Sequence, residues 1–320
     1  MKSAGYLLLA LAVLPAQAQA FDFSLAPDRT RYLADPSYMQ AKGELDGEST
    51  LGYSNTTEDR YLSDGTLSPK YTANTIKAGQ SLTYGITNRI NASVSETYMH
   101  RSVKDAYPDQ TESFNLSGFE DPDLSLRGRV IPQGKAPFYF DVVGGYSPDL
   151  FDAKVASLSG NGSAGRGNQA FNGEVIFGRE MKSWTTQLGF NATHYGDGKS
   201  ETAGSTGTNL YSPFWDYSLE WKNEARFTDA IFLNTGITFD WQGSYTINIA
   251  GDAPFRRSSD MNTTFYLSPG YVIIPQRLSL NAEFDLIEDG DVTDTYSDHA
   301  NTWKNQQELY AGLHLRYKLF

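Results

Sequence analysis

The last twelve residues of the chain alternate with period two between a largely apolar face and a face that carries the charges. One face of this stretch, read as an extended strand, carries Leu309, Ala311, Leu313, Leu315, Tyr317 and Leu319. The other face carries His314, Arg316 and Lys318, and the chain ends on the aromatic Phe320. A strand with one apolar and one charged face is typical of transmembrane β-barrels, where the apolar face meets lipid and the charged face lines the lumen.

The terminal aromatic side chains add a second expectation. We interpret Tyr317 and Phe320 as an assembly signal for the machinery that inserts barrels into the outer membrane. Phe320 is one residue out of step with the apolar face, and a bulge or a frayed last residue reconciles the two.

The same alternation recurs along the chain and is clearest in its second half. Apolar residues at 278, 280, 282, 284 and 286 alternate with polar residues between them, and the stretch 215–222 behaves in the same way. Bacterial single-chain barrels have an even number of strands. We therefore expect an all-β fold, a single antiparallel barrel of about twelve strands, at 44–54, 73–87, 89–101, 114–131, 137–147, 169–180, 184–195, 213–226, 229–242, 261–273, 277–287 and 308–320.

Connections between these stretches are short and long in turn. The short ones carry tight-turn residues and are expected to face the periplasm, at 87–89, 132–136, 181–183, 227–229 and 275–277. The long ones are rich in Gly, Ser, Asn, Asp and Thr and are expected to form outer loops, at 55–72, 102–113, 148–168, 196–212, 243–260 and 288–307.

The N-terminus has the pattern of a secretory signal. Lys2 precedes a short apolar run that Pro15 ends, and Ala18-Gln19-Ala20 is a small-x-small cleavage site. We therefore expect a signal peptide at 1–20, a periplasmic segment or plug at 21–43 and the barrel at 44–320. The export signal and the barrel pattern together predict the cell outer membrane of a Gram-negative bacterium as the location.

Composition excludes several function classes. The chain has no cysteine, which rules out disulfide frameworks and thiol catalysis. Its net charge is −12 and no basic patch is evident, so we expect no nucleic-acid partner. The mean hydropathy of −0.46 fits a barrel in which only every second strand residue faces lipid. The partners expected instead are outer membrane lipids with lipopolysaccharide, the barrel assembly machinery and a small-molecule solute.

One segment in the middle of the chain resembles a known family. Residues 118–129 resemble the Gly-x-Gly-Asp motif, alternating strand and basic-aromatic-basic triplet of outer membrane proteins of the "MetA-pathway of phenol degradation" type, with Glu120 at the second Gly and Gly128 at the aromatic position. Residues 132–135 resemble that family's Pro-x-Gly-Lys turn, and 165–178 resemble its following segment. The family is distantly related to the long-chain fatty acid channel, so the resemblance implies passive import of small hydrophobic or aromatic compounds.

Charged residues on the inward positions of the expected strands are the candidate solute path. The candidates are Arg127, Arg129, Asp141, Glu220, Lys222, Asp240, Glu283, Asp285 and Arg316, with Lys77, Glu174, Asp216, Glu224, Arg226 and Lys318 on the same faces. Such charges either select solutes in a polar pore or form a salt-bridged wall that fills a narrow barrel. Closure of the barrel is expected to bring His314, Arg316 and Lys318 close to Glu44, Asp46 and Glu48. Inward aromatic residues such as Tyr139 and Tyr266 are further candidates for the path.

A proline interrupts one strand next to three carboxylates, Glu120, Asp121 and Asp123. Pro122 inside a strand pattern predicts a kink or bulge, which either shapes the wall or opens it laterally. Three carboxylates so close together also have the chemistry to bind a cation.

Catalysis is the weaker alternative. Only four histidines are present, and Ser297-Asp298-His299 falls in an expected outer loop without a recognisable hydrolase motif. The Asp-rich stretch 288–294 lacks the spacing of a calcium loop. We expect a channel or transporter and no enzyme, cofactor or metal; the alternatives are a structural or surface-interaction barrel with a sealed lumen and an outer-membrane hydrolase that depends on His299 or His194.

Overall fold

The structure is a computed structural model that describes residues 23–25, 33–62, 64–106, 111–155, 161–203, 207–249 and 254–320. The signal peptide expected at 1–20 lies outside the described residues. No described helix is long and apolar enough to cross a membrane.

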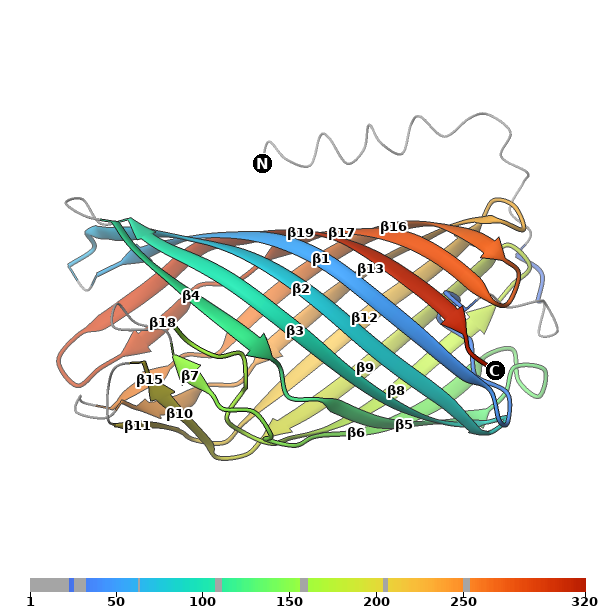
Figure 1. Ribbon diagram of the computed structural model, residues 1–320, viewed down its shortest axis with the longest axis horizontal. Helices are drawn as coiled ribbons and strands as arrows, with labels where there is room; N and C mark the ends of the chain where they lie inside the picture. The colour runs from blue at the N-terminus through green and yellow to red at the C-terminus, as the bar shows by residue number, and fades with distance from the viewer. Residues whose placement is uncertain are drawn as a thin grey trace.

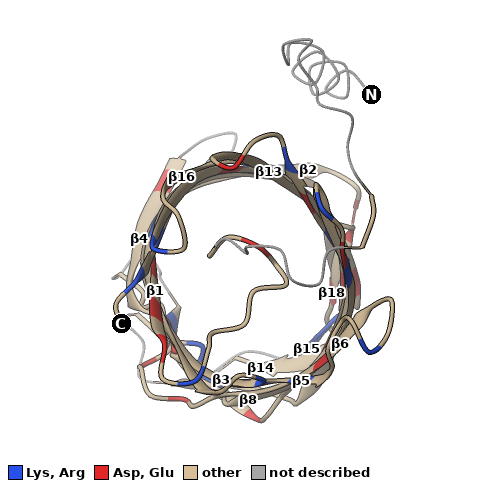
Figure 2. Cartoon of the chain, turned by 90° about the vertical axis from the view of Figure 1, so that its right-hand side faces the viewer, with Lys and Arg blue, Asp and Glu red and all other residues tan. Residues whose placement is uncertain are grey.

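Within the described residues the chain forms a closed antiparallel barrel of twelve wall strands, which confirms the expected fold class (Figure 1). In Figure 2 the strands form a ring around the lumen. The wall consists of β1 (Leu45–Tyr61), β2 (Leu67–Thr87), β3 (Ile90–Ala106), β4 (Thr111–Phe119) with β5 (Asp123–Ile131) as one interrupted strand, β6 (Tyr139–Ser147), β8 (Ala170–Glu180), β9 (Trp184–Tyr195), β12 (Phe214–Arg226), β13 (Ile231–Gln242), β16 (Asp260–Ile274), β17 (Leu278–Glu288) and β19 (Ala300–Lys318).

The barrel closes where β1 pairs with β19, and the charges expected at this seam meet there. Glu48 accepts a hydrogen bond from Arg316 at 2.9 Å and contacts His314 Nδ1 at 2.8 Å. Lys318 Nζ lies 2.8 Å from Glu44. The β1–β19 register places Asp46 opposite Lys318 and Glu48 opposite Arg316, so opposite charges face each other across the closing ladder.

The end of the last strand explains the position of Phe320. Strand β19 stops at Lys318, and the carbonyl of Leu45 accepts the amides of both Leu319 and Phe320, at 2.8 and 3.4 Å. The final two residues therefore leave the regular ladder, and the alternation of faces ends before them.

Outward positions are apolar and inward positions are polar, as a lipid-facing cylinder requires. Leu313 on the outer face is 52% exposed, whereas Asp141 on the inner face is fully buried. Two large inward aromatic rings occupy the space beside glycines on neighbouring strands. A Cβ at Gly178 would lie 2.0 Å from Tyr139, and a Cβ at Gly236 would lie 2.2 Å from Tyr266, so each ring lies flat across a glycine.

Several strands run further than the sequence predicts, because β1, β2, β3 and β19 continue into the stretches expected to be loops. The remaining long connections contain short strands that extend the sheet beyond the wall. These are β7 (Lys154–Val155), β10 (Gly198–Thr202), β11 (Thr208–Tyr211), β14 (Tyr245–Asn248), β15 (Phe255–Arg257) and β18 (Val292–Thr295). Outside lipid neither strand face needs to be apolar, so hydrogen-bonded strands there leave no alternation in the sequence.

Candidate functional site in the lumen

Within the segment 33–43, residues 33–40 lie inside the barrel and are held there by the wall, and 41–43 are exposed next to the turn between β2 and β3. Asp35 Oδ2 lies 2.6 Å from the Arg226 guanidinium on β12. From β5, Arg127 donates to the carbonyl of Pro36 at 3.3 Å and Arg129 donates to the carbonyl of Ser37 at 2.9 Å. Figure 2 looks into the ring from the end at the right of Figure 1, and a segment of chain crosses the opening.

Gln40 and Tyr38 attach the same segment to the start of the barrel. Gln40 donates to Asp46 at 3.0 Å, and the Tyr38 hydroxyl donates to Glu44. The segment is therefore fixed through side chains of β1, β5 and β12, far apart around the ring.

The predicted residues Arg127, Arg129 and Asp141 form one buried network. Asp141 Oδ2 accepts from Arg127 at 2.6 Å, and Asp141 Oδ1 accepts from Arg129 at 2.8 Å. The Arg129 guanidinium also lies 4.3 Å from the centre of the Tyr139 ring and 3.8 Å from Glu180. Because each arginine also binds a carbonyl of the segment 33–43, this network is the support on which that segment rests.

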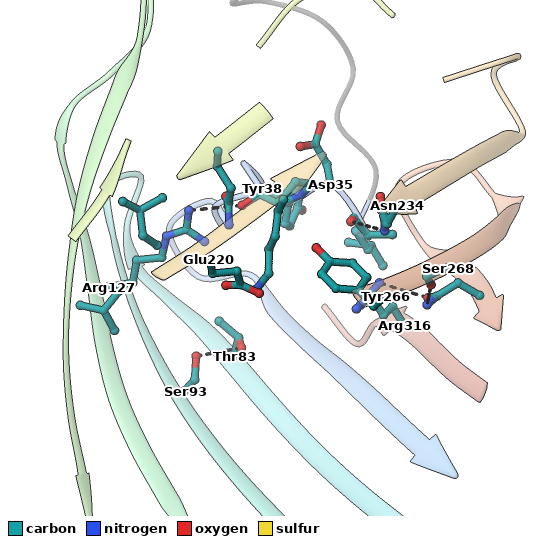
Figure 3. Close-up of a pocket in the computed structure, with 18 of the residues that line it drawn as sticks. Asp35, Tyr38, Thr83, Ser93, Arg127, Glu220, Asn234, Tyr266, Ser268 and Arg316 are labelled. Atoms are coloured by element: carbon teal, nitrogen blue, oxygen red, sulfur yellow. Dashed lines mark hydrogen bonds and ion pairs between the residues drawn. The ribbon is translucent and has the colours of Figure 1, made fainter. Parts of the chain in front are cut away.

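A second group of predicted residues surrounds a cavity of about 630 Å³ in the lumen. Glu220 and Lys222 on β12, Glu283 and Asp285 on β17 and Arg316 on β19 all line it, with Arg127. Figure 3 shows Arg127 and Arg316 on opposite sides of this space, with Glu220 and Tyr266 between them. Lys222 Nζ lies 2.6 Å from Glu220, and Arg316 also donates to Asn281 at 3.1 Å.

Asp240 does not belong to this group. It lies on the inward face of β13, opposite Ser218 of β12 and Asn262 of β16, and it is not among the residues that line the cavity. The alternation thus predicted that Asp240 lies on the inward face, but it did not predict the position of Asp240 along the barrel axis.

The interruption at 120–122 separates β4 from β5 and organises the connection after β6. Asp121 is 2% exposed, and its carboxylate accepts the amides of Leu150, Phe151 and Arg166 at 2.8, 2.9 and 2.8 Å. Asp123 contacts Arg166 at 3.1 Å. Glu120, on the other side of Pro122, lies 3.7 Å from Lys77. The carboxylates therefore bind parts of the chain itself.

Among the described residues, a single contact supports the hydrolase alternative. His299 Nδ1 lies 2.7 Å from Asp298 Oδ1, and its ring stacks on Tyr296 at 4.3 Å. In the part of the chain that the structure describes, no serine hydrogen-bonds to the His299 ring. His194 stacks edge-on against Trp215 at 4.8 Å. Within the described residues no group of His, Asp or Glu side chains is arranged to hold a metal ion.

Sequence reasoning missed two contributions to the site. Asp35 and its neighbours carry no periodic pattern, so only the tertiary structure places them in the lumen. Neutral polar residues on inward positions, such as Ser93, Asn234 and Asn281, complete the cavity lining. The sequence alternation does indicate these residues, because they occupy inward positions of clearly alternating strands.

Comparison with known proteins supports the fold. No family model matches the chain, and no curated protein matches it in sequence. Among solved structures it is similar to the COG4313 outer membrane channel from Pseudomonas putida F1, with 14% identity and a TM-score of 0.59 over 89% of this chain and 98% of that one.

Two further structures are less similar. A Pseudomonas aeruginosa FadL homologue has 9% identity and a TM-score of 0.45 over 86% of this chain and 90% of its own. The outer membrane protease OmpT from Escherichia coli has 10% identity and a TM-score of 0.37 over 92% and 100%. The first of the three similarities shows that this chain has the barrel fold of an outer membrane protein.

Proposed function

We propose that this chain is an outer membrane channel through which small solutes pass passively. The observation that carries the proposal is the cavity of about 630 Å³ inside a closed barrel, lined largely by polar side chains. In a barrel with a sealed lumen, side chains would fill the interior, as they do in narrow barrels. A polar cavity of this size instead has room for a small molecule.

The fold and the outward apolar surface support an outer membrane location. Residues 1–20 would then direct export, and Tyr317 and Phe320 would be read by the barrel assembly machinery. Outer membrane lipids and lipopolysaccharide would surround the barrel. Among the described residues, the strands that reach beyond the wall lie at the end away from the C-terminus, which would be the outer side (Figure 1).

The class of solute rests on two indications. The resemblance at 118–129 implies small hydrophobic or aromatic compounds. The lining of the cavity favours solutes that also carry a polar group, because an entirely apolar solute would leave lumen side chains without hydrogen-bond partners.

Liposome swelling tests the proposal. Folded protein in liposomes should admit a small sugar and cause swelling, whereas protein-free liposomes should not swell. A folded, inserted sample that leaves the liposomes sealed would instead favour a structural barrel with a sealed lumen.

A further inference from the structure

The charges that line the lumen cavity do not balance. Five carboxylates line it, those of Asp35, Glu174, Glu220, Glu283 and Asp285. Three cationic side chains line it, those of Arg127, Lys222 and Arg316. The cavity wall is therefore negative overall.

Each of the three cations is already bound to a carboxylate. Arg127 lies 2.6 Å from Asp141, Lys222 lies 2.6 Å from Glu220, and Arg316 lies 2.9 Å from Glu48. These pairs neutralise most of the positive charge locally, so little of it remains to attract an anion.

Two of the carboxylates lack such a partner. Within the described part of the chain, neither Glu174 nor Asp285 has a cationic group within ion-pair distance. Asp285 Oδ1 is in addition shielded from solvent and accepts no hydrogen bond from a described residue. A carboxylate oxygen in a partly desolvated wall is stabilised by any cation that enters the cavity.

An aromatic ring stands beside one of these two carboxylates, that of Asp285. The β16–β17 register places Tyr266 directly opposite Asp285. Glu220, Glu283 and Asp285 line the same cavity as Tyr266. Its ring lies across Gly236. The Tyr266 side chain lines the cavity next to Arg316, as Figure 3 shows.

We propose that this part of the cavity binds small organic cations, with an alkylammonium group seated between the Tyr266 ring and the carboxylate of Asp285; Glu283, which lies 3.6 Å from His314, adds negative charge nearby. An alkylammonium group is attracted by a ring face and by a carboxylate, and its alkyl part tolerates an aromatic wall. Anions are repelled by the unbalanced charge, and neutral solutes gain neither contact. The inference rests on the proposed function and names its solute class.

Binding of choline to the full-length folded protein in detergent, measured by titration calorimetry, tests the inference. Its uncharged isostere 3,3-dimethyl-1-butanol has nearly the same shape and separates charge from size. The wild-type protein should bind choline at least about tenfold more tightly than the isostere, since a partly buried charge contact of this kind is worth about one order of magnitude in affinity. Equal binding of the two probes, or no choline binding, would overturn the inference.

Three variants locate the site. Asp285→Asn should weaken choline binding about tenfold and leave the isostere unaffected. Tyr266→Leu should weaken choline binding several-fold, and Tyr266→Phe should retain it, because phenylalanine keeps the ring face. Glu288→Gln is the matched control, an exposed carboxylate three residues further along β17 on its other face, and it should change nothing.

Folding of each variant is checked by the heat-dependent mobility of the barrel on gels. Equal losses for Asp285→Asn and Glu288→Gln would contradict the inference. Choline binding in a protein that leaves liposomes sealed would refute the channel and keep the cation site. Liposome swelling without preferential choline binding would support the channel and overturn the cation site.

Discussion

Asp35→Asn tests whether the segment 33–43 restricts the lumen. The Asp35 side chain is fully buried, and its Oδ2 lies 2.6 Å from Arg226. Its Oδ1 accepts the amide and hydroxyl of Ser37 at 2.9 and 2.7 Å. Asparagine keeps an acceptor for Ser37 and removes the negative charge that faces Arg226.

The size of the effect follows from that contact. A hydrogen bond to a charged group contributes about 1.5–3 kcal/mol and a neutral one about 0.5–1.5 kcal/mol, so the loss is about 1–2 kcal/mol. Arg226 remains 2.7 Å from Glu224, and the wall therefore keeps its own pair. A loss of this size lowers the ratio of docked to undocked segment by about 5–30-fold.

Single-channel recording in planar bilayers measures this ratio. The fraction of time spent at higher conductance should rise by about the same factor in Asp35→Asn. Asp291→Asn is the control, because Asp291 pairs with Lys304 at 3.9 Å on the exposed surface, where such a pair contributes little. If Asp35→Asn and the wild type show the same open fraction, the segment does not restrict the path and the reasoning fails.

Three further predictions concern the segment, the wall and the outer end. Deletion of 21–43 should raise conductance above that of Asp35→Asn, and unchanged conductance would remove the segment from the account. Gly178→Val places side-chain atoms where the Tyr139 ring lies and should destabilise the barrel by about 1–3 kcal/mol in urea unfolding, with an unchanged midpoint as the contrary result. Burial, followed by the charge of Asp260, raises the pKa of Asp289, in the connection after β17, to about 6. The Asp289 carboxyl therefore binds its proton more tightly in the folded state than in the unfolded chain, and the protein loses stability as pH rises from about 4 through 6. Asp289→Asn should consequently be more thermally stable than the wild type at pH 8 and not at pH 4. Equal stability differences at both pH values would contradict this reasoning.

The wall of the barrel was predictable because lipid imposes a rule on every second residue. The bounds of β9, Trp184–Tyr195, agree with the sequence-based expectation, since apolar residues on its outer face alternate with polar ones inside. The seam was predictable for a similar reason, because a closed sheet must join its first and last strands.

The cavity was only partly predictable. The alternation gives the face of a residue, but the register of neighbouring strands decides which inward residues meet. Asp285 and Tyr266 are directly opposite each other, while Asp240 lies outside the cavity lining, and no local pattern distinguishes these cases. The position of 33–43 depends on Arg127, Arg129 and Arg226 from two separate strands, and no pattern within the segment itself records it.

Ionic conductance of the full-length folded protein in planar bilayers tests the central claim most directly. The account predicts discrete conductance steps in potassium chloride, with potassium preferred over chloride because the lumen is negative. Bilayers that contain demonstrably folded and inserted protein yet show no steps above the protein-free baseline would contradict it.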